Sequence, residues 1–151
     1  MMIYLASRYS RRLELCEYKA QLEERGHSVP ARWLLGEHQV HGLEASKAVE
    51  DSGPIPLEQA RLFGNDDVED ILAADVMLNF TEAPRTGPTR GGRHCELGIF
   101  LGLKFAGREP QRQLFVVGHL ENVFHAIDDI DGRFSDFDSF LRALDTGEVR
   151  L

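Results

Sequence analysis

TRGGRHCELGIFLGLK, residues 89–104, combines a glycine pair, one carboxylate and an apolar run, and the other segments of the chain are interpreted around it. Two glycines, Gly91 and Gly92, open it, and the apolar run behind them predicts a helix that starts near Gly92. Glu96 then shares one helical face with the apolar residues three, four and seven positions further on. A charged side chain on an apolar face is unfavourable unless another group pairs with it or uses it.

Two interpretations of Glu96 follow from its place in the predicted first turn of this helix. In the simpler one, the carboxylate only complements the helix dipole and the free N–H groups of the first turn. In the other, it belongs to a binding or catalytic site. The glycine pair favours a site, because residues without a Cβ let another molecule approach the backbone where the helix begins.

Composition excludes several classes of protein. A chain of 151 residues predicts one domain, residues 1–151, with a substantial core. A net charge of −8 argues against nucleic-acid binding, although a local basic pocket for a phosphate remains compatible with it. We interpret the two cysteines, Cys16 and Cys95, as reduced core thiols of a cytoplasmic protein. The apolar run near the N-terminus is too short for a signal peptide or a membrane span, so no membrane association is expected.

Strand-like and helix-like segments alternate along the chain. Strands are predicted at residues 3–6, 27–33, 75–80, 114–117 and 134–137. Helices are predicted at residues 10–25, at 57–74 with a break near 64–65, from Gly92 onward, at 120–127 and at 139–144. This order predicts an α/β fold, a doubly wound, flavodoxin- or Rossmann-like parallel sheet of five strands. Its ligand site should lie at the carboxyl ends of the strands.

The segment between the second strand and the next helix contains two histidines, His38 and His41. No acidic residue or cysteine has the spacing that a metal site would need, so we expect a surface loop over the ligand, with no metal and no cofactor. Further along, Asp67, Glu69 and Asp70 are expected in the first turn of a short helix after the break, where acids are ordinary dipole partners.

The predicted topology brings distant residues together at one edge of the sheet. Ser7 and Arg8 follow the first strand, the segment 90–96 follows the third, and Asn122 follows the fourth. Asp67 lies on the helix that leads into the strand at 75–80. Carboxylates, arginines and glycine amides gathered in this way suit a small polar ligand, with or without a phosphate.

Three short motifs, in this order and spacing, resemble the nucleoside 2-deoxyribosyltransferase family, which includes the related nucleoside 5′-monophosphate N-glycosidases. They are residues 4–7 (YLAS), Asp67 placed eight residues before Asp75, and residues 96–98 (ELG). The resemblance extends from Met2 to about His125, and the segment after Ile127 matches nothing in the family.

The resemblance implies roles for individual residues. Glu96 matches the catalytic glutamate that attacks the anomeric carbon, Asp67 an aspartate near the sugar, and Tyr4 a tyrosine that orients the glutamate. Gly91 and Gly92 match the loop around the 5′ end of the sugar. A carboxylate can trap an oxocarbenium-like carbon as an ester, which water or a second base then displaces. Either Asp67 or a bound water would protonate the leaving base.

One departure from the family leaves the substrate open. Deoxyribosyltransferases carry an aspartate six residues before the glutamate and the monophosphate hydrolases a serine, whereas this chain has Arg90. Arg90, with Arg93 and Arg8, favours an anionic 5′ group, unless these arginines are solvated surface residues. The expected substrate-binding set is Ser7, Arg8, Arg90, Gly91, Gly92, Arg93 and Asn122.

Two functions therefore remain at this stage. The first is cleavage of the N-glycosidic bond of a nucleoside or its 5′-monophosphate, with transfer to another base or to water. The alternative is a catalytically inactive nucleotide-binding module on the same fold. The resemblance also implies a homodimer or a higher homo-oligomer, and the apolar residues on both sides of the Glu96 helix are consistent with it.

Overall fold

The computed structural model describes residues 1–36, 57–83, 91–106 and 112–151. The His38/His41 segment and Arg90 lie outside these ranges, so the predictions made for them stay predictions.

A parallel sheet forms the centre of the fold. Its strands lie in the order β1 (Ile3–Ala6), β2 (Val76–Phe80), β3 (Gln113–Val117) and β4 (Gly132–Phe134). Tyr4 lies beside Met77, and Asn79 lies between Ala6 and Val116. Every residue of β1 and β2 is buried. This burial on both faces explains why these strands are apolar runs rather than alternating sequences.

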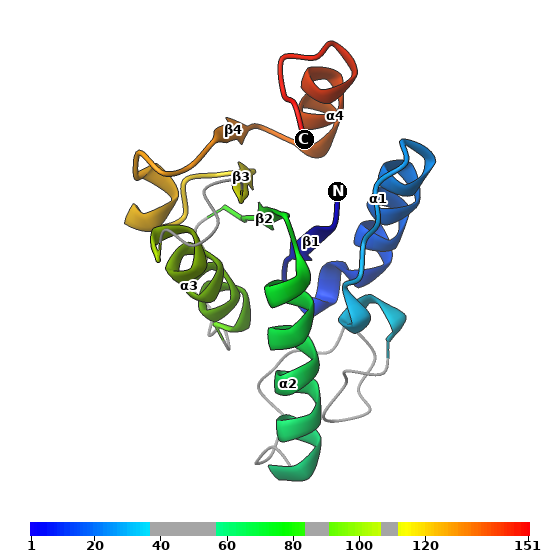
Figure 1. Cartoon of the computed structure of the whole chain (residues 1–151), viewed down its shortest axis with the longest axis vertical. Helices are drawn as coiled ribbons and strands as arrows, with labels where there is room; N and C mark the ends of the chain where they lie inside the picture. Colours follow the sequence, from blue (N-terminus) through cyan, green and yellow to red (C-terminus); the bar gives the residue numbers. More distant parts are fainter. Residues whose placement is uncertain (37–56, 84–90, 107–111) are drawn as a thin grey trace.

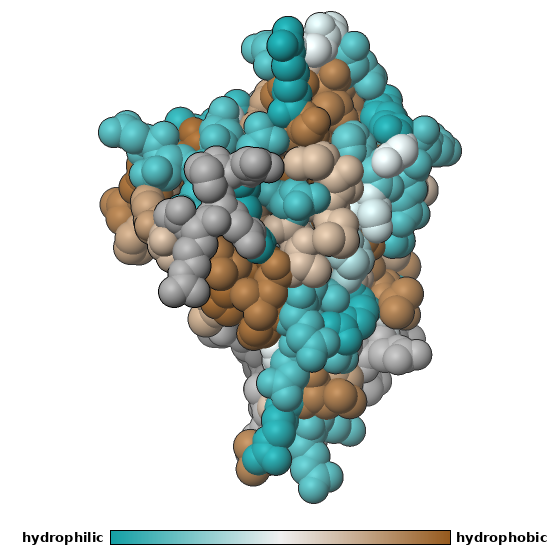
Figure 2. All heavy atoms as spheres, viewed as in Figure 1, coloured by the Kyte–Doolittle hydropathy of each residue, from teal (hydrophilic) through white to brown (hydrophobic). Residues whose placement is uncertain are grey.

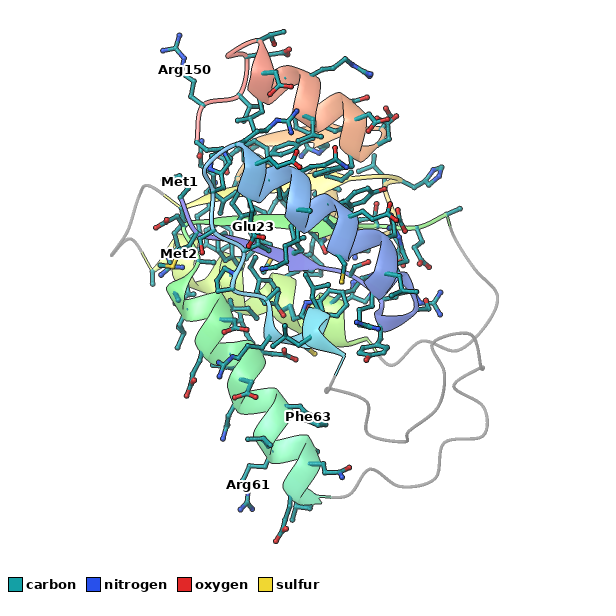
Figure 3. The ribbon with its side chains drawn as sticks, turned by 90° about the vertical axis from the view of Figure 1, so that its right-hand side faces the viewer. Met1, Met2, Glu23, Arg61, Phe63 and Arg150 are labelled. Carbon is teal, nitrogen blue, oxygen red and sulfur yellow. The ribbon has the colours of Figure 1, made fainter. Side chains whose placement is uncertain are left out.

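Helices cover both faces of the sheet (Figure 1). On one face lie α1 (Arg12–Glu24) and α4 (Phe137–Asp145), and on the other lie α2 (Leu57–Ala73) and α3 (Gly92–Phe105). The rings of Tyr18 and Phe137 stack with their centroids 4.0 Å apart and join α1 to α4. The early turns of α2 extend beyond the rest of the fold, where Figure 3 labels Arg61 and Phe63. The prediction of a doubly wound α/β fold is confirmed.

The prediction of a strand at residues 27–33 is wrong. This segment makes a single parallel bridge, between Met2 and Ser28, and then turns into a 3₁₀ helix, η2 (Arg32–Leu35). Pro30 cannot donate a ladder hydrogen bond. Trp33 is drawn inward instead, and its Nε1 donates to the Leu5 carbonyl at 3.0 Å. The sheet that the described residues form has four strands rather than the five expected.

Two helix boundaries also differ from the prediction. Helix α2 is continuous through residues 64–65, so Glu69 and Asp70 lie in its later turns and not in a first turn. They bind Arg32, which also pairs with Asp66. At the other end of the chain, strand β4 ends before residue 135, because Asp136 accepts a hydrogen bond from the Ser139 N–H at 2.7 Å and starts α4.

The two cysteines were expected in the core. Instead, Cys95 is exposed and Cys16 is half-buried. In the described part of the chain, no helix is long and apolar enough to cross a membrane.

Between β3 and β4 the chain forms a short 3₁₀ helix, η4 (Val123–Ala126), where a longer helix was expected.

Candidate active site

Buried polar atoms lie beneath the first turns of α3. Tyr4, on β1, is fully buried, and Ser7 follows at the carboxyl end of the same strand. Among the described residues, the Tyr4 hydroxyl, Ser7 Oγ and Glu96 Oε2 have no hydrogen-bond partner of normal geometry. Buried polar atoms without partners are rare and costly, about 1–3 kcal/mol each. Their concentration at this edge of the sheet marks a place where a ligand can supply the missing partners.

Glu96 projects from the second turn of α3, because the helix begins at Gly92 and its first turn holds no acidic residue. The expectation of a first-turn carboxylate is therefore wrong by one turn. The N-cap, Gly91, has φ of +73°, a conformation that glycine adopts without strain. One turn deeper, Glu96 lies against the sheet rather than at the open N–H groups.

Burial raises the pKa of Glu96 to about 8, and the negative charge of Asp67 adds to the shift. The Tyr4 hydroxyl and the Arg93 guanidinium act in the opposite direction. Asp67 comes from α2 and Glu96 from α3, and these helices pack side by side on the same face of the sheet. The structure therefore brings together Tyr4, Asp67 and Glu96, the three residues for which the family resemblance implies catalytic roles.

The hydroxyl of Tyr4 stays protonated at neutral pH. Burial is the main reason that its pKa lies well above the usual value, and the charges of Glu96, Asp67 and Asp70 raise it further. A protonated phenol is a hydrogen-bond donor. The hydroxyl lies close enough to Glu96 to lower the pKa of that carboxyl, and the orienting role implied by the resemblance stays a prediction.

Two arginines predicted to bind substrate already have carboxylate partners. Nη1 of Arg8 lies 2.7 Å from Oε2 of Glu82, and Nη2 of Arg93 contacts Oε1 of Glu121. Neither glutamate was singled out in the sequence. The topological rule that placed Arg8 could have found them, because Glu82 follows β2 and Glu121 follows β3.

Asn122 belongs to an amide–imidazole cluster. Its Oδ1 accepts from the Phe124 N–H at 2.9 Å, and its Nδ2 lies 3.3 Å from Nδ1 of His94 and 3.2 Å from Nε2 of His125. The same His125 nitrogen lies 3.2 Å from Nδ2 of Asn79. His125 is fully buried, and burial lowers its pKa. Asn79 and His125 carried no signal in the sequence beyond their places near strand ends.

Metal binding finds no support in the part of the chain that the structure describes. No group of three or more histidine, cysteine, aspartate or glutamate side chains there could hold an ion.

Comparison with solved structures shows which known proteins have a similar fold. No protein-family model and no curated protein sequence matches this chain. Among solved structures, the 2-deoxyribosyltransferase of Bacillus psychrosaccharolyticus is similar, with a TM-score of 0.62 and 19% identity, over 93% of this chain and 90% of that one. The CMP N-glycosidase BcmB of Clostridium botulinum is similar with a TM-score of 0.53 and 15% identity, over 96% of this chain and 99% of that one. The chain thus has the Rossmann-like fold of these two proteins, which is the fold predicted from the alternation of strands and helices.

Proposed function

We propose that this protein is an enzyme that cleaves the N-glycosidic bond of a nucleoside or its 5′-monophosphate, with Glu96 as the nucleophile. The observation that carries the proposal is a buried carboxyl at the edge of the sheet, its pKa raised to about 8 by burial and by Asp67, with the Tyr4 hydroxyl beside it. The names of the two structural neighbours, a deoxyribosyltransferase and a CMP N-glycosidase, support the same kind of reaction.

In the proposed first step, a carboxylate oxygen of Glu96 bonds to C1′ of the sugar while the bond from C1′ to the base nitrogen breaks. The electron pair of the broken bond stays on the base, which takes a proton from the Asp67 carboxyl. In the second step, water or the nitrogen of another base attacks C1′ and releases Glu96. Asp67 takes the proton that the incoming group loses, so the site returns to its starting state.

The raised pKa of Glu96 supports a proton shared between Glu96 and Asp67, which this mechanism needs. Below pH 8 the Glu96 carboxyl of the empty site is protonated, and a protonated carboxyl cannot attack C1′. Asp67 is close enough to raise that pKa by its charge, so it is the neighbour that can accept the proton. Once Asp67 holds the proton, Glu96 is the nucleophile and Asp67 the acid. Tyr4 then donates a hydrogen bond to the Glu96 carboxylate and holds it in place.

A panel of nucleosides and 5′-monophosphates, incubated with the protein, tests the proposal. Each substrate is assayed with and without a second free base, and chromatography follows the released or exchanged base. We expect base release from at least one substrate and its loss by several orders of magnitude in Glu96→Gln, which keeps the side-chain size and removes the charge. Binding without base release would favour the inactive nucleotide-binding module, and normal turnover in a folded Glu96→Gln would remove Glu96 from the mechanism.

We also propose a homodimer or a higher homo-oligomer. Figure 2 shows an apolar patch over α3, next to α2. On these helices Phe105 is 58% exposed and Leu72 47% exposed, whereas Leu97 and Phe100 are buried against the sheet side of α3. Apolar surface of this kind is commonly covered by a partner. Light scattering at micromolar concentration should give at least twice the 17.0 kDa chain mass, and a monomer mass would contradict the assembly.

A further inference from the structure

We propose that Glu82 and Glu121 determine substrate specificity, because their carboxylates occupy the guanidinium groups of Arg8 and Arg93 and so select an uncharged nucleoside over its 5′-monophosphate. The inference rests on the proposed function, and it narrows the substrate class that the sequence left open.

The two ion pairs connect four segments at the carboxyl edge of the sheet. Arg8 follows β1, Glu82 follows β2, Glu121 follows β3, and Arg93 lies in the first turn of α3. The backbone N–H of Glu82 also donates to Oε2 of Glu121 at 3.4 Å, which links one pair to the other. These are the loop ends where the ligand of a doubly wound sheet binds.

Both pairs are shielded from water. The Arg8 and Glu82 side chains are 20% and 10% exposed, and those of Arg93 and Glu121 are 4% and 17% exposed. Removing one partner of such a pair leaves an uncompensated buried charge, which is strongly unfavourable. A phosphate that took the Arg93 guanidinium would displace Glu121 and leave it in that position, and a phosphate that took Arg8 would break the ion pair with Glu82.

The charge at this edge also disfavours a phosphate. Among the described residues, the two pairs together are neutral, the nearby Arg11 is paired with Glu14, and Asp67 and Glu96 are acidic. A phosphate monoester brings about −1.5 to −2 charges near neutral pH. The positive charge of Arg93 also acts on Glu96, because it opposes the upward shift of the Glu96 pKa. An uncharged nucleoside meets none of these penalties.

The test is the ratio of kcat/KM for a deoxynucleoside to kcat/KM for its own 5′-monophosphate. We expect the unmodified protein to prefer the nucleoside. Glu121→Gln and Glu82→Gln each free one guanidinium, so each should shift the ratio toward the monophosphate by roughly tenfold or more, as one charge-assisted hydrogen bond allows. Asp145→Asn is the matched control. It removes an acid that pairs with Arg25 at 2.8 Å, far from the carboxyl ends of the strands, and should leave the ratio unchanged.

A binding measurement separates this inference from the proposed function. In a Glu96→Gln background, calorimetry compares the affinities for the same nucleoside and monophosphate, with and without Glu121→Gln or Glu82→Gln. The inference is overturned by a preference for the monophosphate in the unmodified protein, by an absence of nucleoside binding, or by ratios that neither glutamate variant changes. Tight nucleoside binding without base release in the unmodified protein would contradict the proposed reaction and still support the specificity. Thermal melting of each variant establishes that it is folded. Because the two variants change different ion pairs, either one tests the inference if the other does not fold.

Discussion

Asp67 on α2 raises the pKa of Glu96 on α3 through the negative charge of its carboxylate. The two residues belong to helices separated in sequence by a strand and a loop, yet their charges interact beneath one edge of the sheet. Their coupling gives the site a proton near neutral pH, and most of the predictions below depend on it.

Replacing Asp67 by asparagine should lower the pKa of Glu96 below about 8, because the Coulombic contribution is lost while burial remains. Carbon-detected NMR of the Glu96 side-chain carboxyl would follow the titration, with Glu96→Gln identifying the resonance. Glu69→Gln, on the same helix but 69% exposed, is the control and should leave the titration unchanged. An unaltered Glu96 titration in Asp67→Asn would show that burial alone sets the pKa.

The pH dependence of kcat/KM should fall above about pH 8. The free site holds one proton on the Asp67–Glu96 pair below that pH, and the proposed mechanism delivers this proton to the leaving base. Above pH 8 the proton is lost and the base must leave without it. A rate that instead rises through pH 8 would show that only the ionised Glu96 matters and that water protonates the base.

Glu96→Gln should stabilise the fold at alkaline pH. The folded state holds the Glu96 proton up to about pH 8, whereas an unfolded glutamate releases it near its usual value of 4.5. Because the folded state binds more protons in this window, the contribution of Glu96 to stability is fully present below pH 4.5 and is lost as the pH rises through about 8. Glutamine has no such dependence. The melting temperature of the variant should exceed that of the unmodified protein by several degrees at pH 9. This difference should shrink toward pH 5.

Gly118→Ala should destabilise the fold by about 1–3 kcal/mol. Gly118 has φ of +116°, and a Cβ there would lie 2.7 Å from Oγ1 and 2.8 Å from the carbonyl oxygen of Thr81. Gly118 and Thr81 follow β3 and β2, whose ends are joined by hydrogen bonds from the Thr81 N–H and hydroxyl to the Val117 carbonyl. Gly98→Ala is the matched control, since it lies in α3 with nothing within 4 Å of a new Cβ, and alanine favours a helix by about 0.5–1 kcal/mol. Equal melting temperatures for the two variants would contradict the close approach.

Parts of this structure that depend on local sequence were predictable. Strand β1 and strand β2 are apolar runs, and α3 shows a helical spacing behind two glycines, so each segment carries its own signal. Their alternation predicted the parallel sheet, the rule for ligand sites placed Asp67 and Glu96 at one edge, and the family resemblance added Tyr4. The failures at residues 27–33 and 64–65 arose where Trp33 and Arg32 make contacts with distant segments that no local pattern contains.

Most of the order of strands and helices, and the choice of Glu96, thus follow from local sequence patterns, because hydrophobic periodicity and glycine placement act over a few neighbouring residues. The ionisation of Glu96 and the partners of Arg8 and Arg93, in contrast, depend on the three-dimensional arrangement of the chain. Burial and Coulomb energies depend on distances between atoms from different segments. Those distances are set by how helices pack on the sheet, and the residue order of any one segment does not contain them.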